Sequence, residues 1–165
     1  MMKIIKTYLP SIVIAVVISL FLRTYVAEAM KVPTGSMIPT IEINDRLFVE
    51  KLMWMTKLEH GDIVVFHSPV EPKRYVKRLI GLPGDVIEIK DGNLYRNQEV
   101  VNEPYIKDKM NYNYGPVTVP ADNYFFLGDN RNESYDSHLW PVPFVKKDKI
   151  IGKVWFEIPT HIFAR

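Results

Sequence analysis

The chain begins with a short basic stretch that leads into its only strongly apolar segment, residues 7–22. Lys3 and Lys6 precede this segment and Arg23 ends it. A membrane-spanning helix needs about 20 apolar residues, and the segment reaches that length if Lys6 and Arg23 extend their charged ends to the two interfaces. The sequence therefore predicts an N-terminal anchor, followed by about 135 residues that are enough for one folded core.

Two other interpretations of this segment stay open. Ala27, Glu28 and Ala29 have the small-x-small form of a cleavage site, so the segment can also be a signal sequence that is removed. A helix buried in a soluble protein is the third interpretation. In the first two cases the leading positive charge places the N-terminus in the cytoplasm and the remaining chain outside it.

Composition narrows the classes of function that the chain can have. Hydrophobic residues make up 47% of the sequence, which indicates a folded domain. The 21 basic and 19 acidic residues are interspersed, so no basic tract points to nucleic acid. The chain has no Cys, and its four His residues lack zinc-ligand spacing. With no phosphate-binding loop either, we expect no metal and no other cofactor.

Beyond the apolar segment the sequence changes to short strand-like runs separated by Pro and Gly. Asp91 and Gly92 lie between two alternating runs, which is a strong signal for a β-hairpin. No segment in this part has a sustained helical period. We therefore predict a mostly β fold of curved antiparallel sheets with one N-terminal transmembrane helix. The strands are expected at residues 47–49, 62–66, 75–80, 86–90, 93–96, 124–127 and 154–158.

The expected organisation has two parts. Residues 1–29 form a cytoplasmic tip, the membrane anchor and a junction, and residues 30–165 form an extracytoplasmic β domain. Residues 85–123 are expected to be a smaller β excursion, with the polar, Asn- and Tyr-rich stretch 103–119 on the surface. The apolar loop around Trp54 either belongs to the core or lies at the membrane interface.

Ser36 is the first candidate for chemistry. It lies in a Gly-containing turn flanked by two prolines, about a dozen residues past the apolar segment, so it is a candidate nucleophile close to a membrane. A Ser hydroxyl needs a base. His138 and Asp136, two residues apart, would share one face of a strand and suggest a Ser36–His138–Asp136 triad. Such neighbours seldom give the linear arrangement that a triad requires.

Lys77 is the alternative base. It follows Val76 and precedes Leu79 and Ile80 in an otherwise apolar run. Burial disfavours the ammonium form, and a base that works near neutral pH needs a pKa well below the usual value of about 10.4. By itself the same pattern also fits a Lys at a strand edge with its amine in water.

The order of four segments decides between these bases. Residues 32–40, 61–66, 75–85 and 128–137 follow the apolar segment in that order and closely resemble the conserved boxes of bacterial type I signal peptidases. The compact chain is similar to the shorter enzymes of Gram-positive bacteria. The resemblance implies a membrane-bound serine endopeptidase that removes signal peptides, with Ser36 as nucleophile and Lys77 as neutral general base.

The resemblance also implies supporting roles. The Ser36 backbone N–H and the Thr34 hydroxyl match the groups that stabilise the oxyanion, Ser134 matches a Ser that orients the Lys amine, and Asp136 matches an acid that braces the site. Residues 129–131 match a turn with a structural role. One departure is His138, which stands where the family usually has an Arg paired with the Asp. A His can pair with Asp136, but it loses its charge near neutral pH.

The implied partners are the lipid bilayer and secretory preproteins with small residues at positions −1 and −3 of the cleavage site. The peptide is expected to bind extended, as an added strand between the Ser and Lys segments. The expected location is the cell membrane, as a single-pass protein with a cytoplasmic N-terminus. Ala27, Glu28 and Ala29 then form either a coincidental match or a self-cleavage site. The expected pocket walls are Val32, Pro33, Met37, Tyr75 and Val76.

Two alternatives to the leading interpretation remain. A self-cleaving Ser/Lys protease of related fold is one, although such proteins carry a DNA-binding module and nothing in this sequence resembles one. A non-catalytic, membrane-tethered β domain that binds exported peptides is the other. The combined presence of Ser36, Lys77 and Ser134 argues against it.

Overall fold

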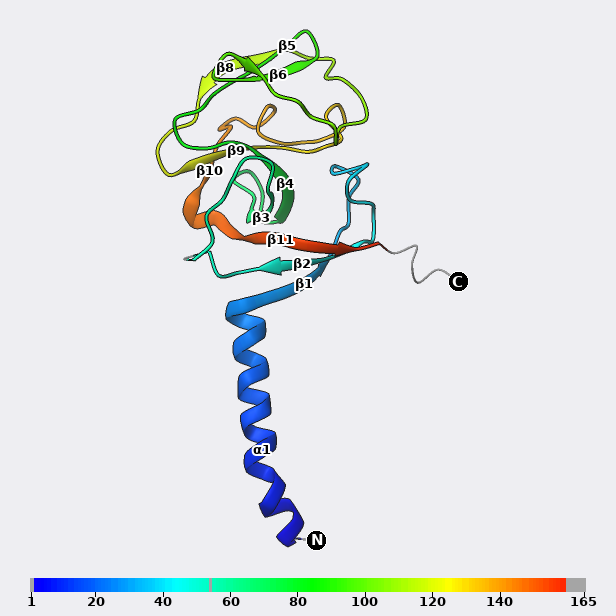
Figure 1. Cartoon of the computed structure of the whole chain (residues 1–165), viewed down its shortest axis with the longest axis vertical. Helices are drawn as coiled ribbons and strands as arrows, with labels where there is room; N and C mark the ends of the chain where they lie inside the picture. Colours follow the sequence, from blue (N-terminus) through cyan, green and yellow to red (C-terminus); the bar gives the residue numbers. More distant parts are fainter. Residues whose placement is uncertain (1, 54, 160–165) are drawn as a thin grey trace.

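A single long helix leads into a β domain in the computed structural model of this chain, which describes residues 2–53 and 55–159 (Figure 1). Helix α1 (Met2–Phe21) continues into the π-helical turn η1 (Leu22–Val26). Tyr8–Val26 is the one stretch of the described residues long and apolar enough to cross a membrane, with a mean hydropathy of 2.0. None of it is buried against the β domain, so the interpretation as a buried helix of a soluble core is wrong.

Two antiparallel sheets make up the β domain within the described residues. The larger sheet has the order β1-β2-β11-β3-β4-β9-β10 and the smaller one β7-β6-β5-β8. The strands of the larger sheet are β1 (Ala27–Lys31), β2 (Arg46–Glu50), β11 (Ile150–Ile158), β3 (Ile63–His67), β4 (Arg74–Gly81), β9 (Asn123–Leu127) and β10 (Val145–Lys146). The smaller sheet contains β7 (Glu99–Val100), β6 (Asn93–Arg96), β5 (Val86–Lys90) and β8 (Tyr114–Thr118), and the 3-10 turn η2 (Lys147–Lys149) precedes β11.

The larger sheet curls strongly. Arg74 of β4 forms an ion pair of 2.8 Å with Glu28 of β1, although three strands separate β4 from β1 in the sheet order. Strand β11 shifts register twice, and its Gly152 packs against the Glu50 carbonyl so closely that no side chain would fit there. Together with the antiparallel pairing, the curl confirms the predicted curved antiparallel fold.

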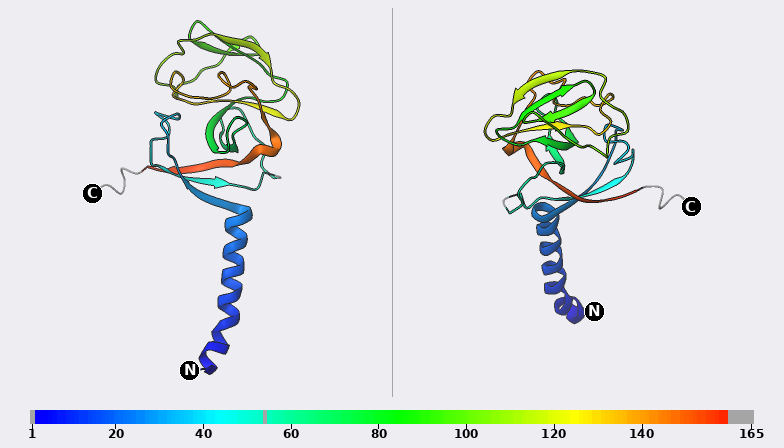
Figure 2. Two further views of the ribbon diagram at one scale, coloured as in Figure 1. Left: turned by 180° about the vertical axis from the view of Figure 1, so that it is seen from behind. Right: turned by 45° about the horizontal axis from the view of Figure 1, so that its top comes forward.

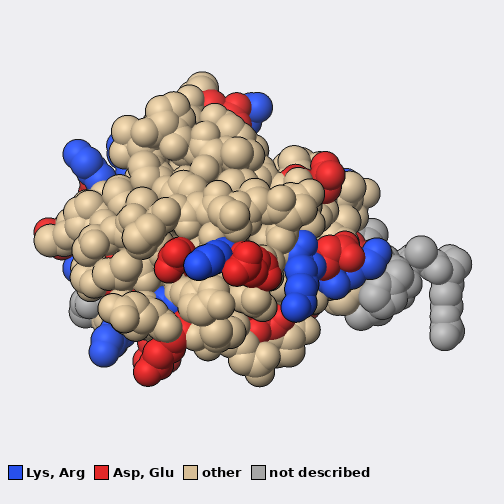
Figure 3. Space-filling model, turned by 90° about the horizontal axis from the view of Figure 1, so that it is seen from above, with Lys and Arg blue, Asp and Glu red and all other residues tan. Residues whose placement is uncertain are grey.

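The smaller sheet covers the larger one on the side away from α1 (Figures 1 and 2). A shared apolar core joins the two, so the smaller sheet is packed onto the domain that carries β4 and β9. On the far end of the molecule, acidic and basic side chains are interspersed (Figure 3). The buried residues of the shared core are Ile80, Ile87, Ile89, Leu94, Met110, Val119, Phe125 and Leu127.

The predicted hairpin is confirmed. Lys90 pairs with Asn93, and Asp91 and Gly92 between them have φ angles of 51° and 74°, as a two-residue hairpin turn requires. The stretch 103–119 is not confined to the surface, since Met110 is buried. Trp54 lies outside the described residues.

Candidate active site

The turn that carries Ser36 lies between β1 and β2 and is held from both ends. Val32 and Met37 are buried in the interior of the curled sheet, which fixes the backbone on either side of Ser36. Asn130 binds the turn itself, because its N–H donates to the Ser36 carbonyl (3.1 Å) and its Nδ2 to the Gly35 carbonyl (3.2 Å). Ser36 is half-buried, and its backbone is held in place by the buried residues on either side of it and by Asn130.

Lys77 reaches Ser36 from β4. Its register partner is Val64 of β3, and its side chain is 4% exposed, so the alternative of an amine in water at a strand edge is wrong. The Lys77 amine and the Ser36 hydroxyl are hydrogen-bonded. Burial lowers the pKa of Lys77 from 10.5 to about 8, although the negative charges of Asp136 and Asp129 oppose that change.

His138 contacts Asp136 and not Ser36. Its Nδ1 lies 2.7 Å from Asp136 Oδ1, and its ring stacks on Tyr112 with 4.0 Å between the centroids. The other oxygen of Asp136 accepts a hydrogen bond of 2.8 Å from the Gly128 N–H. Within the described residues, the side-chain partner of the Ser36 hydroxyl is Lys77, so the geometry favours the lysine base over the triad.

Ser134 is buried beside Gly128 but does not make the expected bond. Among the described residues its hydroxyl has no hydrogen-bond partner, so its predicted contact with the Lys77 amine is absent from this structure. The Gly128 α-carbon packs tightly against both Ser134 and the Ser36 carbonyl, which lie on the same side of it. Ser134 therefore adjoins the backbone of the Ser36 turn.

A buried charged network supports the segment that holds Asn130. Arg78 binds Asp129 through two nitrogens at 2.8 and 2.6 Å, and Arg131 binds Glu103 through two nitrogens at 2.6 Å each. The Tyr105 ring lies 3.9 Å from the Arg78 guanidinium. Sequence reasoning missed Glu103 and Tyr105, because a polar stretch gives no signal that it folds back onto the site.

An open cleft of about 570 Å³ surrounds the Ser36–Lys77 contact. All five predicted wall residues line it, and Thr34 lies exposed at its edge. Charged residues besides Lys77 also line it, namely Glu71, Lys73, Arg74 and Glu133. Within the described residues no group of His, Cys, Asp or Glu could hold a metal ion. The lining residues are Met30, Val32, Pro33, Thr34, Gly35, Ser36, Met37, Glu71, Lys73, Arg74, Tyr75, Val76, Lys77, Asn130, Glu133 and Tyr135.

Ala27, Glu28 and Ala29, the residues that resemble a cleavage site, belong to β1. They pair with β2 in regular antiparallel register, Ala27 with Glu50 and Ala29 with Phe48. Cleavage of the bond after Ala29 within the same molecule would require this pairing to open, since proteases bind peptides in extended form in their own cleft.

These features define a class of protein. A serine hydroxyl in contact with a buried amine at an open cleft is an arrangement that hydrolases with a serine nucleophile use.

The comparisons with known proteins all indicate one family. The family model "Signal peptidase, peptidase S26" matches residues 5–158. "Probable signal peptidase I-2" of Synechocystis sp. is 45% identical over 88% of this chain and 69% of its own length. "Signal peptidase I P" of Bacillus subtilis subsp. natto is 40% identical over 88% of this chain and 84% of its own length. A solved structure of a signal peptidase I from Enterococcus faecalis has a TM-score of 0.50 and 34% identity over 59% of this chain and 97% of that one.

The chain therefore belongs to the signal peptidase family, peptidase S26. It is a peptidase whose reaction is the cleavage of signal peptides and whose substrates are secretory preproteins. The resemblance seen in the four sequence segments is confirmed.

Proposed function

We propose that the chain is a membrane-bound serine endopeptidase in which Ser36 attacks the scissile carbonyl and neutral Lys77 is the general base. The observation that carries this proposal is the hydrogen bond between the Lys77 amine and the Ser36 hydroxyl inside the cleft. A Ser hydroxyl is a weak nucleophile until a neighbouring base accepts its proton, and Lys77 is the basic side chain in contact with it.

Each half of the reaction needs two proton transfers through Lys77, one to its amine and one from it. As Ser36 Oγ bonds to the scissile carbonyl carbon, its proton moves to the neutral Nζ. The resulting ammonium protonates the leaving amine nitrogen as the peptide C–N bond breaks, which leaves an acyl-enzyme ester on Ser36 and a neutral Lys77. Water then gives a proton to Lys77 and attacks the ester, and the proton returns to Ser36 as the signal peptide leaves as a carboxylic acid.

The oxyanion is stabilised by the Ser36 N–H and the Thr34 hydroxyl. Thr34 is exposed at the cleft, two residues before Ser36, so its hydroxyl is free to turn toward a bound carbonyl. Such donors stabilise the transition state because the negative charge develops where they point, and one donor contributes about 10²–10³ in rate.

Asp136 and Ser134 support the dyad. Asp136 binds the Gly128 N–H at 2.8 Å, and Gly128 packs against the Ser36 carbonyl, so Asp136 acts on the nucleophile turn through this glycine. The unpaired Ser134 hydroxyl is close enough to the same backbone to orient the site when substrate is bound.

The preprotein binds as an extended strand beside β4. Strand β9 pairs with β4 from Arg78 onward, whereas the residues from Arg74 to Lys77 pair with β3 alone among the described strands. The free edge of this half of β4 faces the cleft and offers backbone groups to a peptide. Val76 and Met37 are both buried beneath the cleft, which leaves shallow apolar pockets that fit small side chains.

Helix α1 anchors the protein in the cell membrane. The candidate span Tyr8–Val26 has 19 residues, which at ~1.5 Å per residue cover about 28 Å, close to the hydrocarbon thickness of a bilayer. Lys3 and Lys6 place its N-terminus in the cytoplasm and the β domain on the other side. Trp155 and Phe156 of β11 are 68% and 50% exposed, and β11 lies at the α1 end of the β domain, where aromatic side chains suit the membrane interface (Figure 1).

The proposed function is tested with the full chain in detergent and a preprotein with Ala at positions −1 and −3. We expect one cut after the −1 residue, seen as two product masses. A −1 Ala→Trp substrate should react at least about a hundredfold more slowly, because its ring overfills a pocket floored by Val76 and Met37. Trp at +5 serves as the matched control. Equal cleavage of both substrates would disprove the small pocket, and binding without cleavage by folded protein would indicate a peptide-binding domain.

Activity should also depend on the charge of Lys77. Because its pKa is about 8 and only the neutral amine accepts the Ser36 proton, kcat/KM should rise about tenfold per pH unit below pH 8 and level off above it. The measurement is kcat/KM from pH 5.5 to 9.5 with a substrate that has no titrating group near the cut. A profile that is flat from pH 6 to 9 would contradict a lysine base.

A further inference from the structure

A second hollow lies outside the proposed active site and shares no lining residue with it. It encloses about 770 Å³ between the β2–β3 connection and the turn that leads into β11 (Figure 1). The β2–β3 connection begins at the membrane end of the domain, because the Lys51 N–H donates to the carbonyl of Val26 (2.9 Å), the last residue of the candidate membrane span. The lining residues are Met53, Met55, Thr56, Lys57, Leu58, Leu82, Pro83, Tyr124, Lys147 and Ile150.

The lining of this hollow is apolar and basic. Most of the lining is apolar, and Met55 at its edge is 68% exposed. Two lysines, Lys57 and Lys147, reach it from opposite segments, and no Asp or Glu lines it. Within the described residues neither lysine forms an ion pair, whereas Lys51, Lys73 and Lys153 each have an acidic partner. Acidic residues lie next to the lining: Glu50 accepts a hydrogen bond of 2.6 Å from the Thr56 hydroxyl, and Asp122 and Asp148 line a neighbouring hollow together with Lys147.

We infer that this hollow binds one anionic phospholipid, with the phosphate between Lys57 and Lys147 and the upper acyl chain on the apolar floor. An apolar cavity with two unpaired cations matches a ligand that is both anionic and apolar. Because the β2–β3 connection that lines the hollow is bonded at Lys51 to the last residue of the candidate membrane span, the bilayer is the nearest source of that ligand. This inference rests on the membrane location proposed above. A lipid bound in the hollow would fix the height of the β domain over the bilayer surface.

The test is native mass spectrometry of the full chain in a neutral detergent with added dioleoyl phosphatidylglycerol or dioleoyl phosphatidylcholine. We expect one retained phosphatidylglycerol per chain in preference to phosphatidylcholine. Lys57→Glu combined with Lys147→Glu should lower phosphatidylglycerol retention about tenfold or more, since each cation near an anionic lipid contributes on the order of 1 kcal/mol. Glycerol 3-phosphate should not displace the lipid, because it lacks acyl chains.

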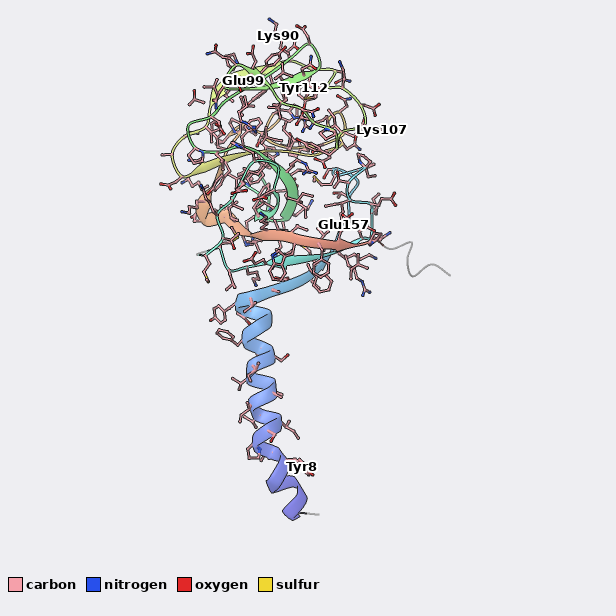
Figure 4. All side chains as sticks on the ribbon, in the orientation of Figure 1. Tyr8, Lys90, Glu99, Lys107, Tyr112 and Glu157 are labelled. Atoms are coloured by element: carbon pink, nitrogen blue, oxygen red, sulfur yellow. The ribbon has the colours of Figure 1, made fainter. Side chains whose placement is uncertain are left out.

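The matched control also reverses two exposed cations, here in β1 and β2. Lys31 of β1 and Arg46 of β2 are register partners outside the hollow, so Lys31→Glu with Arg46→Glu should retain the lipid as the wild type does. A second control reverses Lys90 and Lys107 at the far end of the molecule (Figure 4). Three results would each overturn the inference. The first is an equal loss of phosphatidylglycerol in the Lys57/Lys147 variant and in the Lys31/Arg46 control. The others are wild-type retention by the Lys57/Lys147 variant and displacement of the lipid by glycerol 3-phosphate. The readout is the mass of the retained lipid, so failure of this inference can be distinguished from failure of the chain to cleave a preprotein.

Discussion

Replacing Lys77 with Met is expected to lower kcat for preprotein cleavage by about 10⁴-fold or more, because the Ser36 hydroxyl loses the only base in contact with it among the described residues. Met is unbranched, apolar and similar in length, so it fills the buried site without leaving an unpaired charge. Ser36→Ala and the double variant should show the same residual rate, because two side chains that act as a unit do not have additive effects. Single-turnover cleavage, with circular dichroism as a check on folding, gives the result.

Two further variants make this result specific. Lys153→Met removes a lysine of β11 that is ion-paired with Asp62, and it should leave turnover within about twofold of wild type, since it lies outside the cleft. His138→Gln tests the alternative triad. If His138→Gln abolished cleavage while Lys77→Met retained it, the base would be the histidine, and the hydrogen bond between Lys77 and Ser36 would have no role in proton transfer.

Local signals in the sequence were sufficient for part of this architecture. Asp91 and Gly92 specify their hairpin because only a few residue types adopt positive φ at both turn positions. Strand β4 was recognisable from its apolar run, and the structure buries this run almost throughout. Lys77 within that run was a candidate base, but the apolar pattern around it fitted an amine in water as well as an amine beside Ser36. Only the curl of the sheet, which brings β1 and the Ser36 turn beside β4, decides that point.

The remaining features of the fold and the site depend on contacts between segments that are far apart in the sequence. Strand β1 lies in a stretch that resembles a cleavage site, and only its pairing with β2 makes it a strand. Tyr105 lies in a polar stretch with no periodicity, and its position against Arg78 follows from how the smaller sheet packs on the larger one. The resemblance predicted a structural role for residues 129–131, but it did not indicate that Asn130 binds the carbonyls of Ser36 and Gly35 through its backbone and side chain together.

Gly128 lies at the closest approach between the segments of the site. Its N–H donates to the buried Asp136 carboxylate, and its α-carbon faces both the Ser36 carbonyl and Ser134. An added methyl group would overlap the Ser36 carbonyl oxygen and Ser134 Oγ, and would lie 2.7 Å from Ser134 Cβ. Because protein interiors are close-packed, the nucleophile turn has to move to make room.

Gly128→Ala is therefore expected to lower kcat by about 10³-fold, since a displacement near 1 Å costs about 10²-fold and a misplaced Ser36 N–H also weakens oxyanion binding. Adding Ser134→Gly should not restore the rate, because the overlap with the Ser36 carbonyl remains. Gly84→Ala is the matched control: Gly84 has φ of +92° with open space around its α-carbon, so its variant should lose about 1–2 kcal/mol of stability and keep its turnover. Urea unfolding and single-turnover cleavage separate the two effects. Full turnover by folded Gly128→Ala would show that the Ser36 turn tolerates movement, and recovery with Ser134→Gly would place the constraint on Ser134 instead of the nucleophile.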